Sequence, residues 1–231
     1  MSQQPRQYVG AENLELMENA IRYTSYVGRI VADELPSAGR IVEFGAGSGT
    51  QTSHVVSPNE RVTCIEINPD LQAVLRSKGY QATGSLDDIP VGSVSAFYSI
   101  NCLEHIEDDG AALREIHQRL ADGGSLVLYV PAMPVLFSSM DKLVGHYRRY
   151  RRRELVALLA GAGFTVTKAR YVDSVGVLPS LIYKMIPKAS GEPSPKSLKF
   201  YDNYLFPISL VVDKVTAKLF GKNVFVVAVK K

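Results

Sequence analysis

A short glycine-rich turn constrains this 231-residue chain more than any other feature. The apolar run Ile41–Phe44 predicts a buried strand, and Gly45, Gly47 and Gly49 follow it directly. Glycine lacks a Cβ, so such a turn can bend sharply and bring its backbone close to a ligand. A second apolar run ends about 20 residues later in Glu66, whose carboxylate can accept hydrogen bonds from both hydroxyls of a ribose. The pattern predicts a site for a nucleotide-type cofactor.

The spacing of the glycines separates two kinds of cofactor. A dinucleotide site has the form G-x-G-x-x-G, in which the third glycine lets the helix pack closely while its N-terminus holds a pyrophosphate. Here the spacing is G-x-G-x-G, and Thr50 stands where that third glycine should fall. Glu43 precedes the first glycine by two residues, and a carboxylate there would repel a pyrophosphate but suit a cationic ligand.

The acidic-x-G-x-G-x-G run resembles the first motif of the class I S-adenosylmethionine-dependent methyltransferases, in the type 11/12-like superfamily. The resemblance covers roughly residues 38 to 170. It implies S-adenosyl-L-methionine as the cofactor, which carries an ammonium and a sulfonium and no phosphate. By this resemblance Glu43 lies near the methionyl end of the cofactor, and the glycines form the floor beneath it. Glu66 should hold the ribose, and Ile67 joins the same cofactor-binding set.

Two later segments are similar to the remaining cofactor contacts of the family. The segment 84–90 looks like the adenine-binding segment, although Ser85 stands where the family usually has an acidic residue. Ser85, the backbone of Leu86 and the side chain of Asp87 are the candidates for the adenine contact, in that order. The loop after the fourth expected strand covers the methionine end, and there the backbone of Asn101 is expected to hold the methionyl ammonium.

Strands and helices alternate through residue 130, which implies a parallel sheet with helices on both faces. The family resemblance adds a last strand that runs antiparallel beside the fifth and sixth. The expected fold class is therefore α/β, with a Rossmann-like, mostly parallel seven-stranded sheet and a helical insert before the last strand. The strands are expected at 40–44, 62–66, 81–83, 94–100, 125–130, 164–170 and 223–229.

The length suits one methyltransferase domain with additions rather than two independent domains. The core is expected over about 38–170 and 223–231, preceded by a helix at 11–34. Another helix is expected at 108–121. The helical insert occupies about 171–222, where a minimal fold would need only a short connection.

Composition restricts the location and the partners. The net charge of +3 is modest, and no added RNA-binding domain is evident, which argues against a nucleic-acid partner. The first residues lack the apolar core of a secretory signal, and no run reaches about 18 apolar residues. Cys64 and Cys102 lie on or just after expected strands, which predicts buried thiols in a reducing compartment. The expected location is the cytoplasm, and the sequence leaves the oligomeric state open.

The insert contains two apolar, helix-like pieces at 175–186 and 204–220, separated by a proline-rich loop at 187–196. The apolar stripe of the second piece is expected to pack on the sheet. The alternative is a lid or a hydrophobic wall for a lipid-like or aromatic acceptor, in contact with a membrane surface. The stripe comprises Leu205, Ile208, Val212, Val215 and Leu219.

The loop 137–153 follows the fifth strand, and ligands of open α/β sheets bind beyond the carboxyl ends of the strands. Arg148 and Arg149, flanked by Tyr147 and Tyr150, are expected to bind the substrate. Arginine can grip a carboxylate or phosphate with two N–H groups. The arginines that follow them are equally well explained as solvated residues at the start of a helix.

Methyl transfer from a sulfonium is an in-line displacement that releases a neutral thioether and needs no acid. A hydroxyl acceptor needs a base, and histidine is the usual base near neutral pH. His105, at the rim of the cofactor site, and His146, in the substrate loop, are the expected catalytic residues. His54 and His117 are expected to be structural.

Some methyltransferases of this class hold a divalent ion with the motif Glu-x-x-Glu-His. This chain has Asn101-Cys-Leu-Glu-His105 and lacks the first carboxylate, so no metal is expected. The expected function is methylation of a small-molecule or lipid- or glycan-linked acceptor in a biosynthetic pathway. RNA or protein methylation and a non-catalytic, S-adenosylmethionine-binding regulator are the alternatives.

Overall fold

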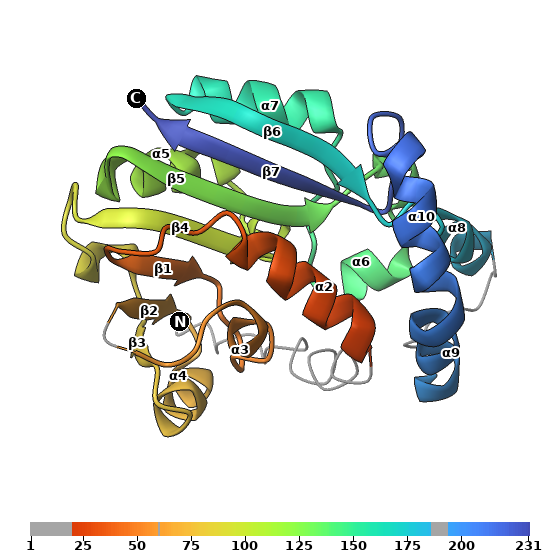
Figure 1. The fold of residues 1–231 in the computed structure, drawn as a ribbon, viewed down its shortest axis with the longest axis horizontal. Coiled ribbons are helices and arrows are strands. Elements are labelled where there is room, and N and C mark those ends of the chain that lie inside the picture. Colours follow the sequence, from red (N-terminus) through yellow and green to blue (C-terminus); the bar gives the residue numbers. More distant parts are fainter. Residues whose placement is uncertain (1–19, 60, 186–193) are drawn as a thin grey trace, which may run out of the picture.

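The computed structural model describes residues 20–59, 61–185 and 194–231, and Figure 1 shows their arrangement. Seven strands form one sheet in the order β3-β2-β1-β4-β5-β7-β6. All neighbouring pairs from β3 to β5 are parallel, whereas β7 is antiparallel to both β5 and β6. This topology confirms the predicted fold class. The strands are β1 (Ile41–Phe44), β2 (Val62–Ile65), β3 (Gln81–Thr83), β4 (Val94–Ile100), β5 (Leu120–Pro131), β6 (Phe164–Val172) and β7 (Asn223–Lys230).

Helices connect the strands, and short single turns follow β3, β4 and β5. The predicted helix at 11–34 corresponds to α2 within the described residues, and residues 1–19 lie outside them. None of the described helices is both long and apolar enough to cross a membrane. The helices are α2 (Ile21–Ala32), α3 (Thr52–Val55), α4 (Pro69–Ser77), α5 (Asp109–Arg119), α6 (Ser139–Leu143), α7 (Arg152–Gly161), α8 (Val177–Met185), α9 (Pro195–Phe200) and α10 (Phe206–Thr216).

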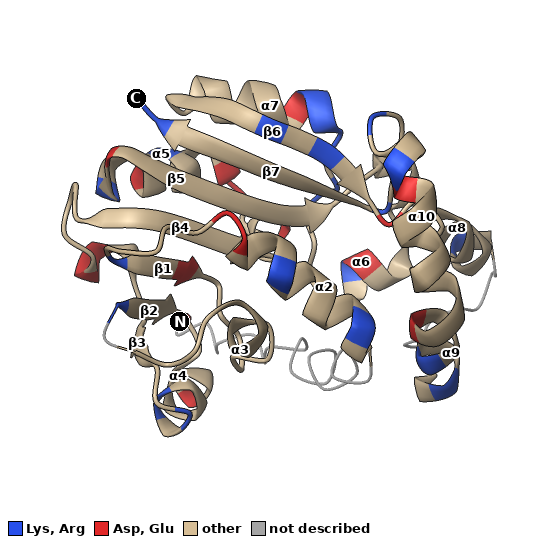
Figure 2. Ribbon diagram, viewed as in Figure 1, with Lys and Arg blue, Asp and Glu red and all other residues tan. Residues whose placement is uncertain are grey.

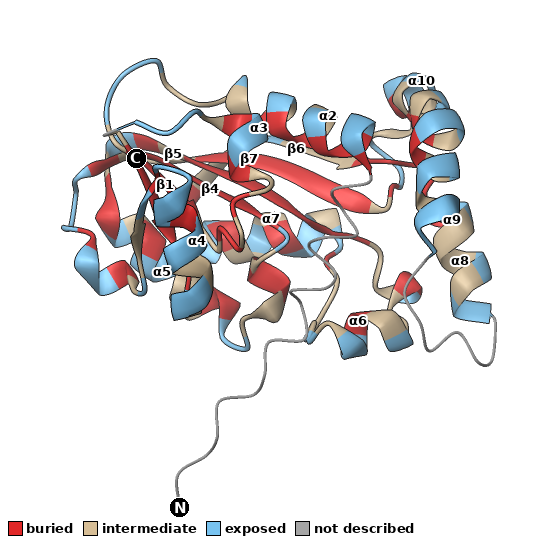
Figure 3. Cartoon of the chain, turned by 90° about the horizontal axis from the view of Figure 1, so that it is seen from below, coloured by how far each residue is buried: buried red, intermediate tan, exposed pale blue. Residues whose placement is uncertain are grey.

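Alternating side chains of the sheet form two apolar layers. Val127 and Tyr129 pack with α2 and α10, whereas Leu126 and Leu128 pack with α5 and α7 on the opposite face. Figure 3 shows these helices on the two sides of the sheet. The central strands are buried on both faces, as expected for a parallel sheet.

The strand order brings the ends of β1 and β4 together. The chain runs outward from β1 to β2 and β3, then returns to place β4 on the other side of β1. Such a reversal opens a crevice beyond the carboxyl ends of the two strands, where α/β proteins bind ligands.

The fifth strand begins earlier than predicted. The predicted helix at 108–121 ends at Arg119, and Leu120 is already extended, with φ −66° and ψ 139°. The paired glycines Gly123 and Gly124 therefore lie inside β5 and do not terminate the helix. The register between β4 and β5 shifts in this irregular stretch.

The insert contains more helix than predicted. Its second piece begins at Pro195, inside the predicted loop, and continues without a break through α9, a π-helical turn at Tyr201–Leu205 and α10. The hydroxyl of Ser194 accepts a hydrogen bond from the backbone N–H of Ser197 at 3.2 Å and caps the start of α9. Residues 186–193 of the predicted loop lie outside the described residues.

The predicted packing of the apolar stripe on the sheet is wrong. Of its five residues, Ile208, Val215 and Leu219 are exposed and Leu205 and Val212 are half-buried, whereas Ser209 and Asp213 face the interior. The reversal has a physical cause, because two carboxylates tie the polar side of this helix to backbone N–H groups. The sequence pattern does not reveal the contacts of these carboxylates, because it predicts only that apolar faces pack on the core.

The two carboxylates are those of Asp202 and Asp213. Asp202 accepts hydrogen bonds from the first turn of α2, at 3.0 Å from the N–H of Arg22 and 2.8 Å from that of Tyr23. Asp213 accepts from the N–H groups of Asp173 and Ser174, which directly follow β6, at 2.7 and 2.9 Å. Buried N–H groups need such partners, so the polar side of the helix is fixed inward.

Replacing Asp202 with alanine removes the cap of α2 and should lower the free energy of unfolding by about 1–2 kcal/mol. Chemical denaturation of the full chain measures this difference. The control is Asp122→Ala, because the side chain of Asp122 is 91% exposed. Equal stability of the two variants would show that the Asp202 cap contributes nothing.

Candidate cofactor and acceptor site

The turn after β1 has the geometry that its glycines predict. The φ angles of Gly45, Gly47 and Gly49 are +81°, +57° and +81°, a region that disfavours residues with a Cβ. A Cβ on Gly45 would lie 2.1 Å from the Sγ of Cys102. The glycine turn therefore packs directly against the loop that follows β4.

The carboxylate of Glu66 ties the end of β2 to the glycine turn. One oxygen accepts from the N–H of Gly47 and the other from the N–H of Asn68, each at 2.9 Å. Each carboxylate oxygen retains a second lone pair, so both could still accept from a ribose diol. The adjacent Ile67 is 79% exposed and offers an apolar surface beside that carboxylate.

Glu43 is buried beneath the turn. One of its oxygens accepts from the hydroxyls of Thr52 at 2.6 Å and Tyr98 at 2.9 Å. Burial raises the pKa of Glu43 to about 7, although the two hydrogen bonds favour its charged form. The carboxylate thus braces β1 against β4 and the helix after the turn.

The adenine candidates lie in the short turn after β3. The hydroxyl of Ser85 accepts from the N–H of Asp87 at 3.0 Å. Asp87 pairs with Arg119 at 2.9 Å, and Arg119 also donates to the carbonyl of Leu86. The side chain of Asp87, which the sequence analysis placed last among the candidates for the adenine contact, is thus already paired with Arg119.

Asn101 directly follows β4 and has a φ of +50°. Its backbone N–H donates to the carbonyl of Tyr129 at 2.8 Å. An ammonium binds a carbonyl and not an N–H, so this bond is compatible with the expected role of the Asn101 backbone.

The two predicted catalytic histidines lie together at this edge of the sheet. The rings of His105 and His146 meet edge to face, with centroids 4.6 Å apart. Burial and the neighbouring His146 lower the pKa of His105 to about 4. The Nδ1 of His146 donates to the Oδ1 of Asp141 at 2.9 Å, because an ionised carboxylate can only accept.

Asp141 is well suited to hold that histidine. Arg149 donates to the same oxygen at 2.7 Å, and Ser138 donates to the other oxygen through its N–H and its hydroxyl. Burial alone would raise the pKa of Asp141, but the contacts with His146 and Arg149 lower it to about 2. The carboxylate is therefore ionised at neutral pH.

Glu104 lies on the other side of the His146 ring. Its Oε1 is 3.7 Å from the Nε2 of His146, and neither of its oxygens makes a hydrogen bond within the described part of the chain. Burial raises its pKa to about 8. Together with His105 and His146 it forms a group whose ligand atoms lie within 4.8 Å of one another, close enough to hold a cation. The metal-free site expected from the sequence stays a prediction.

The predicted substrate residues differ in their surroundings. Tyr147 is exposed, whereas Tyr150 is buried and donates to the carboxylate of Asp109 at 2.9 Å. Arg148 pairs with the same carboxylate at 2.6 Å, and Arg149 pairs with Asp141. These ion pairs anchor the loop on α5 and α6.

Two charged residues, the buried Asp173 and the half-buried Lys222, escaped the sequence analysis. Asp173 follows β6 with a φ of +64°, and its Oδ2 has no hydrogen-bond partner among the described residues. Lys222 precedes β7, and its ammonium lies 5.9 and 5.8 Å from the ring centroids of Tyr23 and Tyr201. Burial lowers its pKa, opposed by the charge of Asp173. Each of the two residues stands next to the end of an apolar strand at the ligand-binding edge of the sheet, and this position in the sequence could have identified them.

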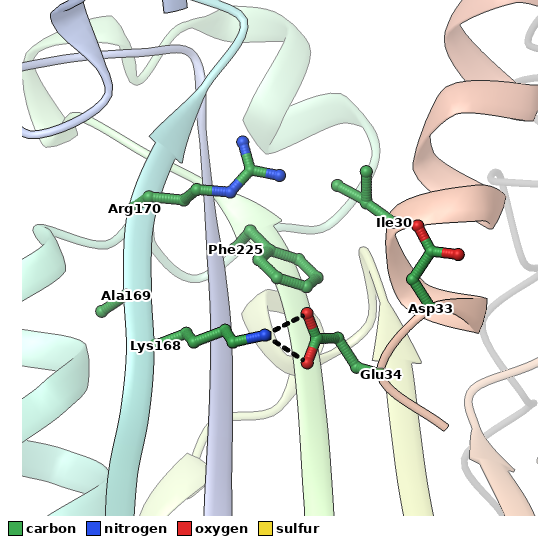
Figure 4. Close-up of a pocket in the computed structure, with 7 residues that line it drawn as sticks. All are labelled: Ile30, Asp33, Glu34, Lys168, Ala169, Arg170 and Phe225. Carbon is green, nitrogen blue, oxygen red and sulfur yellow. Dashed lines mark hydrogen bonds and ion pairs between the residues drawn. The ribbon is translucent and has the colours of Figure 1, made fainter. Parts of the chain in front are cut away.

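A separate hollow of about 390 Å³ lies between α2 and strands β6 and β7 (Figure 4). One wall is closed by Lys168, whose ammonium is 2.8 Å from both carboxylate oxygens of Glu34. None of the predicted cofactor or catalytic residues lines this hollow. It is therefore a different place from the candidate site.

Comparison with known families agrees with the geometry at the carboxyl edge. Residues 17–169 match the family model described as a methyltransferase domain. The chain belongs to the class I S-adenosylmethionine-dependent methyltransferases. Its cofactor is S-adenosylmethionine.

Curated and solved relatives of this methyltransferase are distant. It is 28% identical over 109 residues to a ubiquinone biosynthesis O-methyltransferase of Xanthomonas oryzae. The matched segment covers 42% of this chain and 46% of the relative. The chain thus matches about half the length of that relative. Among solved structures, a putative methyltransferase of Haloferax volcanii, in complex with the activator Trm112, has a TM-score of 0.64 and 16% identity, covering 99% of both chains.

A further solved structure, described as a possible histamine N-methyltransferase of Thermotoga maritima, has a TM-score of 0.62 to this methyltransferase. The two are 17% identical, and the match covers 96% of this chain and 98% of the other. Structural matches at such low identity establish the shared fold but not the methyl acceptor, which has to be inferred from the site.

The stability of this methyltransferase should depend on pH through Glu104. The pKa of Glu104 is about 8 in the folded protein, well above the ordinary value of a glutamate. At a pH between these two values, the folded state therefore binds one proton more than the unfolded state. Stability therefore falls as pH rises from about 5 to 8, by at most about 1.4 kcal/mol per pH unit from this group. Glu104→Gln does not titrate, so its stability relative to the wild type should increase over that range.

Urea denaturation of both proteins at several pH values measures the difference. Glu107→Gln, at an exposed glutamate of the same loop, is the control and should leave the pH dependence unchanged. A difference between Glu104→Gln and wild type that does not vary with pH would contradict the raised pKa.

Proposed function

We propose that this methyltransferase transfers the methyl group of S-adenosylmethionine to a hydroxyl of a small-molecule or lipid-linked acceptor in a biosynthetic pathway. The O-methyltransferase name of the curated relatives supports an oxygen acceptor. The observation that carries the proposal is the orientation of His146 between Asp141 and Glu104, because a hydroxyl acceptor needs a base.

The cofactor supplies an electrophilic methyl group on a sulfonium, and the protein must hold it against the acceptor. In this proposal Glu66 binds the ribose, Ile67 packs beside it, and the carbonyl of Asn101 accepts from the methionyl ammonium. Glu43 supports the turn near the methionyl end, where the hydrogen bonds from Thr52 and Tyr98 favour its charged form and a nearby cation would favour it further. The remaining contacts are Gly45, Gly47, Gly49, Ser85 and Leu86.

His146 acts as the base in this proposal. Its Nδ1–H donates to Asp141, so Nε2 carries the lone pair and takes the hydroxyl proton as the oxygen attacks the methyl carbon. At 3.7 Å from this nitrogen, the Oε1 of Glu104 is too distant for a hydrogen bond with it. The ionised Asp141 stabilises the imidazolium that forms. His105 packs against the ring and keeps it oriented, and its low pKa keeps it uncharged beside that imidazolium.

The substrate loop holds this arrangement and borders the acceptor. Arg149 acts through Asp141, with which it pairs, while Arg148 and Tyr150 fix the loop to Asp109. Tyr147 is exposed beside them and is the side chain of this group best placed to contact an acceptor directly.

Replacing His146 with alanine should lower turnover by about 10²-fold or more, because the positioned base is lost. Cofactor affinity should stay unchanged. The measurement is methyl transfer to a panel of hydroxylated aromatic acceptors, with and without an apolar tail. His54→Ala is the control, since His54 is exposed on α3. Unchanged turnover in His146→Ala would remove this residue as the base, and loss of activity in chelator would show that a metal takes part.

Replacing Glu66 with alanine removes both hydrogen bonds to the ribose and should weaken cofactor binding by about 1.5–3 kcal/mol, roughly 10- to 150-fold. Calorimetric titration with S-adenosylhomocysteine measures the affinity, with NAD titrated in parallel as a ligand that should not bind. Asp70→Ala, at an exposed acid in the first turn of α4, is the matched control. Equal affinities in the two variants would contradict the role assigned to Glu66.

A further inference from the structure

The continuous helix of the insert carries a row of exposed apolar side chains. These side chains recur every three or four residues from the end of α9 through the π-helical turn and α10 to the turn that follows α10, so they lie along one side. Each is more than half exposed. This exposed apolar stripe shares three residues with the stripe predicted from the sequence, and it consists of Phe200, Tyr204, Ile208, Val211, Val215 and Leu219.

Helix α8 presents a second group of the same kind. Leu178, Ile182 and Met185 follow one another at spacings of four and three residues and are all exposed. Figures 1 and 3 both show α8 beside α9 and α10 at one end of the molecule. Large apolar side chains thus gather on adjacent helices, whereas soluble monomers usually expose them singly.

The exposure of the apolar stripe is built into the fold. The opposite side of the same helix carries Asp202, Ser209 and Asp213, all buried. The two carboxylates accept from four backbone N–H groups of α2 and of the segment after β6. Turning the stripe inward would take the carboxylate partners away from those N–H groups, and each N–H left buried without a partner would destabilise the fold. It would also expose Phe206, which is buried on the inward side of the same helix.

The exposed charged side chains of the described insert, on the same helices as the stripe, are all positive. Within residues 175–185 and 194–222, every exposed charged side chain is a lysine, and the only acidic residues are the buried Asp202 and Asp213. Figure 2 shows these lysines on the helices at that end of the molecule. They are Lys184, Lys196, Lys199, Lys214 and Lys218.

We propose that the outer face of α8, α9 and α10 docks onto the surface of an anionic lipid membrane. The apolar side chains enter the boundary between headgroups and acyl chains, and the lysines contact lipid phosphates. The helices lie in the plane of the interface and do not cross it, in agreement with the absence of a spanning helix among the described residues. A second copy of this chain fits the face poorly, because the lysines of the two copies would repel each other.

The position of the face connects docking to the candidate site. Helices α8 to α10 lie beyond the carboxyl ends of β5 and β6, on the side where the cofactor and acceptor loops gather (Figure 1). Docking would place that side toward the membrane, where lipid-linked hydroxyl acceptors are found. The inference goes beyond the proposed function, because membrane binding by this face requires no methyl transfer.

Sedimentation of the full chain with lipid vesicles tests the proposal. Wild-type protein should bind vesicles of phosphatidylcholine with phosphatidylglycerol, and bind those of phosphatidylcholine alone at least about tenfold more weakly. Val215→Glu should lose at least about tenfold in affinity for the anionic vesicles. The control is Val91→Glu on the far loop before β4, since Val215 is 77% exposed and Val91 72%. The control should bind like the wild type.

Three results would overturn the proposal. The first is that the wild-type protein does not bind anionic vesicles. The second is that Val215→Glu and Val91→Glu lose binding equally. The third is that the protein self-associates without lipid and that Val215→Glu abolishes this self-association. Thermal unfolding of each variant verifies that it is folded. Calorimetric titration of the same samples with S-adenosylhomocysteine separates a failure of docking from a failure of the proposed function, because docking variants should bind the cofactor normally.

Discussion

The contact between Gly45 and Cys102 is the constraint on which the site depends. The absence of a Cβ at Gly45 lets the turn after β1 lie directly on the loop after β4. That loop continues within three residues to Glu104 and His105. The turn proposed to lie under the cofactor and the loop that holds the histidine cluster are therefore fixed to each other. The strand order makes this contact available, because β1 and β4 are neighbours whose connections leave in opposite directions.

Burial of charge organises both the site and the insert. At the site, Asp141 is kept ionised by His146 and Arg149, whereas Glu104 lacks such partners and is held neutral by burial at neutral pH. In the insert, Asp202 and Asp213 are satisfied by backbone N–H groups, and the apolar side of the helix is left in the solvent. The donors that surround the buried carboxylates of Asp141, Asp202 and Asp213 thus account for the orientation of the base and of the docking face.

Local patterns predicted the sheet well and the insert poorly. Six of the seven strands begin within a residue of their predicted positions, because each is a short apolar run bounded by turn residues. The start of β5 was missed, since Leu120 reads as the end of an amphipathic helix. Ile208, Val215 and Leu219 were assigned to the core because the contact that helps to turn them outward joins Asp202 to the N–H of Arg22, 180 residues away. The pairing of Asp141 with His146 could be seen only once the loop was folded.

Hydrogen–deuterium exchange of the full chain with and without S-adenosylhomocysteine tests the central claim most directly. If the cofactor occupies the crevice between β1 and β4, amides of residues 45–49, 66–68 and 101–105 should exchange more slowly in its presence. Exchange in the hollow between α2 and β6, around 30–34 and 168–170, should not change. Protection confined to that hollow, with no change around the glycine turn, would contradict the account.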